Sequence, residues 1–114
     1  RSLVGSEMCI RDSWQPALLA MVQAACIGGA ETDSPIGVCG EAGGDPLVAL
    51  VLVGLGVSTL SMAPGKVTAV RAALARHDLA TCQEMARRAV AAPTAEAARQ
   101  AVIDLAHPEV LDLL

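Results

Sequence analysis

The sequence predicts an α/β fold in which short parallel strands alternate with helices. Apolar residues make up 54% of the 114 residues and aromatic residues only 1%, so the core must be built from Ala, Val and Leu. This composition suits helices that pack closely on a buried parallel sheet. Apolar segments of strand length also alternate with segments of helical periodicity, which implies parallel strands joined by right-handed crossovers.

The predicted elements follow one another from Trp14 onwards. A helix starts at Pro16 and is expected to stop at Gly28-Gly29, where a polar turn begins. Asp45 is a good cap for the helix that Pro46 opens. The expected order is a strand at 36–39, a glycine-rich loop at 40–44, a helix at 46–55 that ends at Gly56, and a strand at 57–62.

Three more helices are predicted after the second strand. The first runs from about Lys66 to Arg76, the second is capped by Asp78, and the third is capped by Thr94. Residues 108–114 are expected to form a short apolar tail. The expected buried stripe of the second of these helices consists of Leu79, Cys82, Met85, Ala86 and Val90.

The first thirteen residues differ from the rest of the chain. Residues 1–13 have no clear period, and they mix charged residues with Met8 and Cys9. We interpret them as a non-native leader and begin the domain at residue 14, so that it spans 14–114. The alternative is a genuine but divergent loop.

Charge and hydropathy exclude two classes of function. The net charge is −4, the eight basic residues are scattered, and there is no Tyr or Phe to stack on bases, so nucleic-acid binding is not expected. The longest apolar run, 47–57, is interrupted by Gly54 and Gly56 and is too short for a membrane span. No secretory signal is recognisable, so a cytoplasmic protein without membrane insertion is expected.

The cysteines do not form a metal-binding or disulfide pattern. They stand at positions 9, 26, 39 and 82, and no two have the two-residue spacing of zinc ribbons or thioredoxin-type sites. We expect free thiols and no metal ligand. His77 and His107 lie beside helix breaks and are interpreted as capping or solvent-facing residues.

Cys39 is the main candidate for chemistry. It lies at the carboxyl end of the first predicted strand. In α/β folds the functional residues lie at this end of the parallel strands. The surrounding residues read Gly-Val-Cys-Gly-Glu-Ala-Gly-Gly-Asp-Pro from Gly37 to Pro46. Taken without this motif, a single cysteine at a strand end is more often structural.

The ten residues resemble the Cys-Gly-Glu segment of the phosphoenolpyruvate-binding barrel of the PEP-utilising enzymes, such as enzyme I of the bacterial sugar phosphotransferase system. Ser61-Met62 at the end of the second strand, and the Pro-Thr break between the last long helices, also resemble enzyme I. Pro64-Gly65-Lys66 departs from the Ser-Ile-Pro-like segment that is usual there. The resemblance covers about residues 14–105.

The resemblance implies a fold and a place within it. A complete TIM (β/α)8 barrel has eight strand–helix units in about 250 residues. This chain supplies the last helix of one unit, two complete strand–helix units and extra C-terminal helices. It is therefore expected to be the C-terminal fragment of such a barrel.

The resemblance also implies a reaction and roles for some residues. Enzyme I transfers phosphate from phosphoenolpyruvate to a histidine and on to the carrier protein HPr, depends on Mg²⁺, and is a homodimer. Cys39 would be the general acid that protonates the enolate to give pyruvate. Gly40 and Glu41 would support the loop, and Ser61 would lie behind the reacting groups.

The Mg²⁺ ligands and phosphate-binding arginines of the family lie on earlier strands, so none maps onto this chain. The fragment alone is therefore expected to be inactive. Three alternatives stay open: a barrel fragment of pyruvate, phosphate dikinase or phosphoenolpyruvate synthase, a non-catalytic dimerisation module, and a thiol redox or metal-binding protein.

Overall fold

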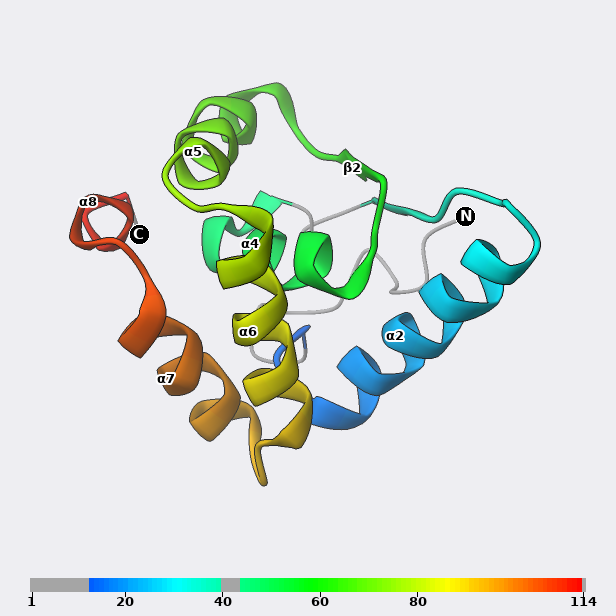
Figure 1. Cartoon of the computed structure of the whole chain (residues 1–114). Coiled ribbons are helices and arrows are strands. Elements are labelled where there is room, and N and C mark those ends of the chain that lie inside the picture. Colours follow the sequence, from blue (N-terminus) through cyan, green and yellow to red (C-terminus); the bar gives the residue numbers. More distant parts are fainter. Residues whose placement is uncertain (1–12, 40–43, 114) are drawn as a thin grey trace.

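The computed structural model describes residues 13–39 and 44–113, and in them several helices pack together with a small parallel sheet at one edge of the molecule (Figure 1). The chain order alternates helix and strand at first and ends in a run of helices. The elements are α2 (Pro16–Glu31), β1 (Gly37–Cys39), α4 (Pro46–Leu55), β2 (Thr59–Ser61), α5 (Pro64–Ala75), α6 (Leu79–Ala91), α7 (Ala95–Leu105) and α8 (Pro108–Leu111).

The two strands are parallel, as the sequence predicted. Gly37 is in register with Thr59, and Cys39 is in register with Ser61. The second strand is shorter than expected because the Val57 N–H donates to the Leu52 carbonyl at 3.0 Å and closes the end of α4. The chain is therefore mixed α/β, with strand, crossover helix and strand in the predicted order.

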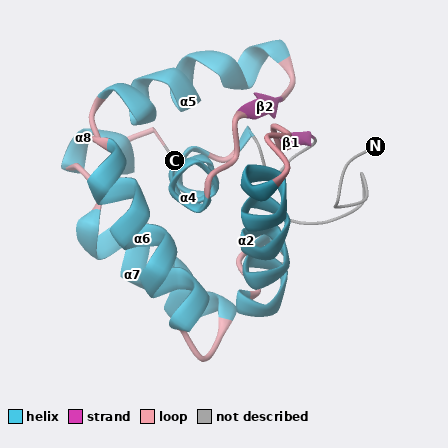
Figure 2. Ribbon diagram, turned by 45° about the vertical axis from the view of Figure 1, so that its right-hand side comes forward, coloured by secondary structure: helices cyan, strands magenta, loops and turns pink. Residues whose placement is uncertain are grey.

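Helix α4 is the centre of the fold. Its residues are apolar on every side, and such a helix is stable only when other elements cover it all round. Seven of its side chains are buried: Leu47, Val48, Ala49, Leu50, Val51, Leu52 and Leu55. Figure 2 shows α4 end-on, with α2, α5 and α6 around it.

Both ends of α4 agree with the sequence prediction. Asp45 accepts hydrogen bonds from the first free helix N–H groups, and Pro46 occupies the first turn, where a missing N–H costs nothing. Gly56 ends the helix in the left-handed conformation with φ 108°, which glycine adopts without strain.

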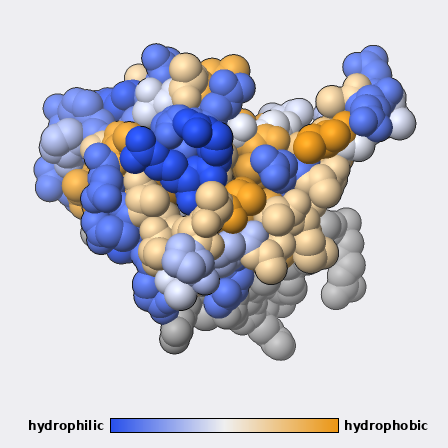
Figure 3. All heavy atoms as spheres, turned by 60° about the horizontal axis from the view of Figure 1, so that its bottom comes forward, coloured by the Kyte–Doolittle hydropathy of each residue, from blue (hydrophilic) through white to orange (hydrophobic). Residues whose placement is uncertain are grey.

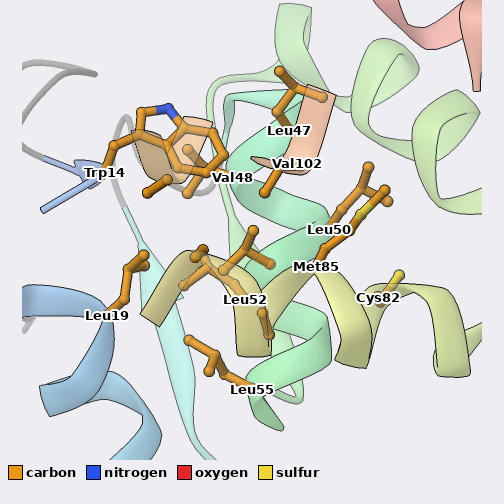
Figure 4. Close-up of a cluster of buried hydrophobic side chains, with 14 of the residues drawn as sticks. Trp14, Leu19, Leu47, Val48, Leu50, Leu52, Leu55, Cys82, Met85 and Val102 are labelled. Carbon is orange, nitrogen blue, oxygen red and sulfur yellow. The ribbon is translucent and has the colours of Figure 1, made fainter. Parts of the chain in front are cut away.

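The hydrophobic core joins α4 to the helices α2, α5, α6, α7 and α8 and to the only aromatic residue. Trp14 is 1% exposed, and Met85 from α6 and Val102 from α7 are fully buried. Figure 4 shows these side chains gathered with Leu19 of α2 and the inward residues of α4 in one cluster. Ser13, the last residue of the expected leader, is also buried.

The expected end of the first helix at Gly28-Gly29 was wrong, since α2 continues to Glu31. Gly29 is instead a point of close approach. A Cβ atom there would lie 2.5 Å from the Ser34 carbonyl oxygen and 2.9 Å from the Ile36 side chain. The glycine therefore allows the chain to turn back tightly against the end of its own helix.

Two further details of the C-terminal helices differ from the prediction. Leu79 is 57% exposed because it is the first residue of α6 and lies beyond the helix contact, whereas Cys82, Met85 and Ala86 are buried as expected. Residues 108–111 form the short helix α8 and not an irregular tail. His107 caps this helix, and the buried side chain of Val110 holds it against the core.

One face of α2 is apolar and uncovered. Met21 and Ile27 are 64% and 56% exposed, and the alanines beside them, Ala20 and Ala24, are exposed too. Figure 3 shows this area as a largely apolar surface on the side of α2. None of the helices in the described ranges is long and apolar enough to cross a membrane.

Candidate functional site

The candidate site lies at the carboxyl ends of the two parallel strands. Cys39 is the last residue of β1 and Ser61 the last residue of β2, and the two are register partners across the sheet. In parallel α/β folds this end of the sheet holds ligands, because the loops that leave the strands converge there. The structure thus brings together two of the four residues selected from the sequence.

Cys39 differs from the other described cysteines in its exposure. It is partly exposed, whereas Cys26 and Cys82 are buried, and all three are free thiols. Burial raises the pKa of Cys26. Burial also raises the pKa of Cys82, and the negative charge of Asp78 adds to that effect. Cys26 and Cys82 are therefore shielded from a substrate, and Cys39 is the most accessible of the three described thiols.

Gly40 and Glu41, the expected supporting residues of the loop after β1, lie outside the described residues. Their roles stay a prediction. The loop continues in Gly44 and Asp45. Asp45 Oδ1 accepts hydrogen bonds from Leu47 N at 2.9 Å and Val48 N at 3.2 Å. A carboxylate already occupies this helix N-terminus, so the end of α4 does not serve as a phosphate cradle.

Lys66 is a candidate that sequence reasoning missed. A Cβ atom on Gly44 would lie 3.2 Å from Lys66 Cγ and 3.6 Å from Met62 Cβ, so the loops that follow β1 and β2 touch. Lys66 is the only lysine in the sequence, and its side chain is exposed at this edge of the sheet. The signal was present, because the Pro64-Gly65-Lys66 segment departs from the family pattern directly after a strand end.

A groove runs along the outer side of β2. It has a volume of about 500 Å³ and lies between β2 and α5, with Leu60, Val67 and Val70 forming its apolar part. Ser61 and Met62 line its end nearest Cys39, and Arg71 lines its wall. Ser61 is exposed, and as the register partner of Cys39 in a parallel pair it points to the same face of the sheet.

Most arginines of the C-terminal helices are held in ion pairs. Arg76 pairs with Glu109, and both Arg87 and Arg88 pair with Glu84. These pairs lie at the surface, where each contributes about 0–1 kcal/mol to stability.

The described residues do not fit a metal ion. In residues 13–39 and 44–113, no three side chains of His, Cys, Asp or Glu come together in a way that could hold one.

A free thiol at the carboxyl end of a parallel strand, followed by a capped apolar helix, is the arrangement of a strand–helix unit in a parallel α/β fold. Residues 5–79 match the PEP-binding domain of the PEP-utilising enzymes. The chain belongs to this family and forms part of its PEP-binding barrel. The matched range starts before Trp14, so it does not mark the expected leader boundary, which stays a prediction.

The relatives include enzymes of the phosphotransferase type. The chain is 47% identical over 98 residues to the phosphoenolpyruvate-protein phosphotransferase of Streptomyces coelicolor, covering 86% of this chain and 18% of that protein. It is 42% identical to a multiphosphoryl transfer protein of Xanthomonas campestris, covering 77% of this chain and 10% of that protein. It is 39% identical to the phosphoenolpyruvate-protein phosphotransferase of Haloferax volcanii, covering 82% of this chain and 17% of that protein. The chain thus spans less than a fifth of the length of these curated relatives.

Proposed function

We propose that this chain is the C-terminal part of a phosphoenolpyruvate-protein phosphotransferase and that Cys39 is its proton donor. The observation that carries the proposal is the position of Cys39, a partly exposed thiol at the carboxyl end of β1 in register with Ser61. The family and the names of the relatives support phosphoenolpyruvate as the substrate and phosphotransfer as the reaction. A dikinase or synthase is less favoured, because these relatives are phosphotransferases.

The proposed step follows loss of the phosphoryl group from phosphoenolpyruvate. The remaining enolate is a carbon base, and the electron pair of its carbon–carbon double bond takes the proton of the Cys39 thiol. A new C–H bond forms, the S–H bond breaks, and the products are pyruvate and a thiolate. The thiolate recovers its proton from solvent, for which the partial exposure of Cys39 leaves a path.

The neighbouring residues would position the reacting groups. The backbone of β1 holds Cys39 at the strand end, and Ser61 lies beside it in the sheet. The side chain of Lys66, packed against Gly44, would supply a positive charge for an anionic substrate. Gly40 and Glu41 would shape the loop between them.

The rest of the activity belongs to the missing part of the parent protein. The proposal places Mg²⁺, the phosphorylated histidine, the docking of HPr and the homodimer contacts there, in a cytoplasmic enzyme. The isolated chain is therefore expected to form no pyruvate from phosphoenolpyruvate. Measurable turnover by the purified chain alone would contradict this division.

A chimera gives the sharpest test of the role of Cys39. The segment of the Streptomyces coelicolor relative that aligns with this chain is replaced by the chain itself, and pyruvate formation is measured. Removal of a general acid lowers turnover by about 10²–10⁴-fold, so Cys39→Ala should lose activity to that extent. Cys26→Ala is the matched control, since it removes a buried thiol that has no proposed part in the reaction.

The quaternary structure of the same variants separates catalysis from a purely interacting role. The exposed apolar face of α2 is the observation that favours an interaction module as the second candidate function. Lost turnover with an intact oligomer supports the catalytic proposal. Turnover of Cys39→Ala within twofold of the parent chimera would refute it, and loss of the oligomer on Cys39→Ala would favour the interaction module.

A further inference from the structure

Lys66 lies at the rim of the candidate site, where the loops that follow the two strands meet. β2 ends at Ser61 and leads into α5 (Figure 1), and Lys66 is the third residue of that helix. The loop that leaves Cys39 returns at Gly44, which is buried. A Cβ atom on Gly44 would lie 3.2 Å from Lys66 Cγ and 3.4 Å from Lys66 Cβ. The stem of Lys66 therefore packs on the end of the loop that begins at Cys39.

The two ends of the Lys66 side chain have different surroundings. Its Cβ and Cγ atoms contact Gly44, whereas the side chain as a whole is exposed. Lysine side chains pack their apolar stem on the protein surface in this way and keep the ammonium group in water. Because the first part of the stem is packed, the positions open to the ammonium group are restricted to the carboxyl end of the sheet.

The ammonium group of Lys66 is not neutralised by the described part of the chain. In residues 13–39 and 44–113 no carboxylate forms an ion pair with it, and the ion pairs found there all join arginines to glutamates. Asp45 follows Gly44 directly, but its Oδ1 atom accepts hydrogen bonds from the first N–H groups of α4. The positive charge of Lys66 is therefore available to an anionic ligand.

The local structure of α5 gains nothing from a positive charge at this position. The N-terminus of a helix carries a partial positive charge, so its first turn favours acidic residues and disfavours lysine. α5 has no acidic residue in its first turn, and Ala63 at its N-cap has no side chain that accepts from the helix N–H groups. A residue that opposes the local electrostatics at the end of a parallel strand indicates a role in the site.

Building on the proposed function, which supplies phosphoenolpyruvate as the substrate, we propose that the Lys66 ammonium group binds the anionic groups of this substrate. Phosphoenolpyruvate carries a carboxylate and a phosphate, and the carboxylate keeps its charge throughout the reaction. An attraction that is equally strong before and during the reaction lowers KM and leaves kcat unchanged. Lys66 is thus a substrate-binding residue that sets affinity, while Cys39 is the proton donor.

The chimera with the Streptomyces coelicolor relative tests this role by separating KM from kcat. Lys66→Met keeps the stem that packs on Gly44 and removes the charge. An ammonium group about 4 Å from one negative charge in water-like surroundings strengthens binding about fivefold, so KM for phosphoenolpyruvate should rise about fivefold at an unchanged kcat. Added salt screens exposed charges, so it should raise KM of the unmodified chimera more than KM of Lys66→Met.

Two control variants assign the effect to a charge at this position. Lys66→Arg keeps the positive charge and should retain most of the affinity for phosphoenolpyruvate. Arg99→Gln removes a positive charge from an exposed position of α7 and should leave KM unchanged. An equal rise in KM for Arg99→Gln and Lys66→Met would show an effect of net charge alone and would overturn the proposal.

Chemical modification of Lys66 gives a measurement that needs no turnover. Lys66 is the only lysine among the 114 residues, so its acetylation by acetic anhydride in the chimera is assigned by peptide mass spectrometry to a single position of this chain. Saturating phosphoenolpyruvate should slow this acetylation, and sodium chloride at the same ionic strength should not. Acetylation that phosphoenolpyruvate slows no more than sodium chloride does would overturn the proposal.

The roles of Lys66 and Cys39 can fail separately. Unchanged turnover of Cys39→Ala, together with a raised KM of Lys66→Met, would refute the proton donor and support the binding role of Lys66. Unchanged KM of Lys66→Met would refute that binding role even where Cys39→Ala loses its activity.

Discussion

Gly54 lies where helix α4 crosses α6, and its replacement by alanine tests the packing on which the whole fold depends. A Cβ atom on Gly54 would lie 2.0 Å from the carbonyl oxygen of Cys82 and 2.9 Å from the backbone nitrogen of Gln83. Both neighbours are backbone atoms within a helix, so no side-chain rotation relieves the overlap. The two helices must separate by about 1 Å before the oxygen reaches ordinary contact distance.

The cost follows from what the separation does to the core. A gap of about 1 Å forfeits a quarter to a half of the dispersion energy between facing atoms, and overpacking of this kind costs about 1–3 kcal/mol. Leu50 and Met85, both fully buried between these helices, would lose most. Alanine regains about 1 kcal/mol as a better helix former. We expect a net loss of about 1 kcal/mol in the free energy of unfolding, which corresponds to a fall of about 5 °C in melting temperature.

Circular dichroism during thermal and urea unfolding measures this change. Gly28→Ala is the matched control, because Gly28 lies inside α2 and a Cβ atom there would meet no other atom within 4 Å. It should gain up to about 1 kcal/mol from helix propensity alone. A Gly54→Ala variant as stable as the unmodified chain would refute the crossing geometry, and a destabilised Gly28→Ala would contradict the course of α2.

The remaining predictions concern caps and thiols. Asp45→Ala should lower the free energy of unfolding by about 1 kcal/mol, measured by urea unfolding, because two helix N–H groups lose their acceptor. The pKa of Asp78 is lowered, so its stabilising effect is present near neutral pH and is lost as acidification protonates it; the acid transition of Asp78→Asn should be correspondingly shallower. At pH 8, iodoacetamide should modify Cys39 faster than Cys26 and Cys82, since burial raises the pKa of those two thiols and lowers their thiolate fraction. Peptide mass spectrometry measures the modification at each cysteine. Equal rates at the three cysteines would contradict the prediction.

The helices around α4 could be predicted because their signals are local. Asp45, Asp78 and Thr94 each cap a helix as expected, since a short side-chain oxygen reaches the next free N–H groups whatever the rest of the fold does. Gly56 likewise ends α4 because a residue with positive φ is needed there. These rules depend only on neighbours within a few residues.

The sequence predictions are wrong where the environment of a residue depends on segments that are not its immediate neighbours in the chain. Gly29 appeared to stop a helix, but it admits the backbone of the following turn, which sequence periodicity does not reveal. Leu79 fits the buried stripe of α6 by its spacing and is nevertheless more than half exposed at the first position of that helix. The position of His77 at a helix break predicts a capping or solvent-facing residue. The hydrogen bond that its Nε2 accepts from the His107 backbone N–H joins residues thirty positions apart, so local sequence does not reveal it.

The sequence by itself determined the alternation of strands and helices, the apolar nature of α4 and the candidate thiol. These features depend on periodicity, helix caps and the motif around Cys39, all of which involve residues that are close together in the chain. The tertiary structure alone decided which residues meet. It set Cys39 in register with Ser61, brought Lys66 against Gly44, and crossed α4 and α6 at Gly54. Such contacts depend on how close two backbones can approach, and that distance is fixed by the packing of the whole core.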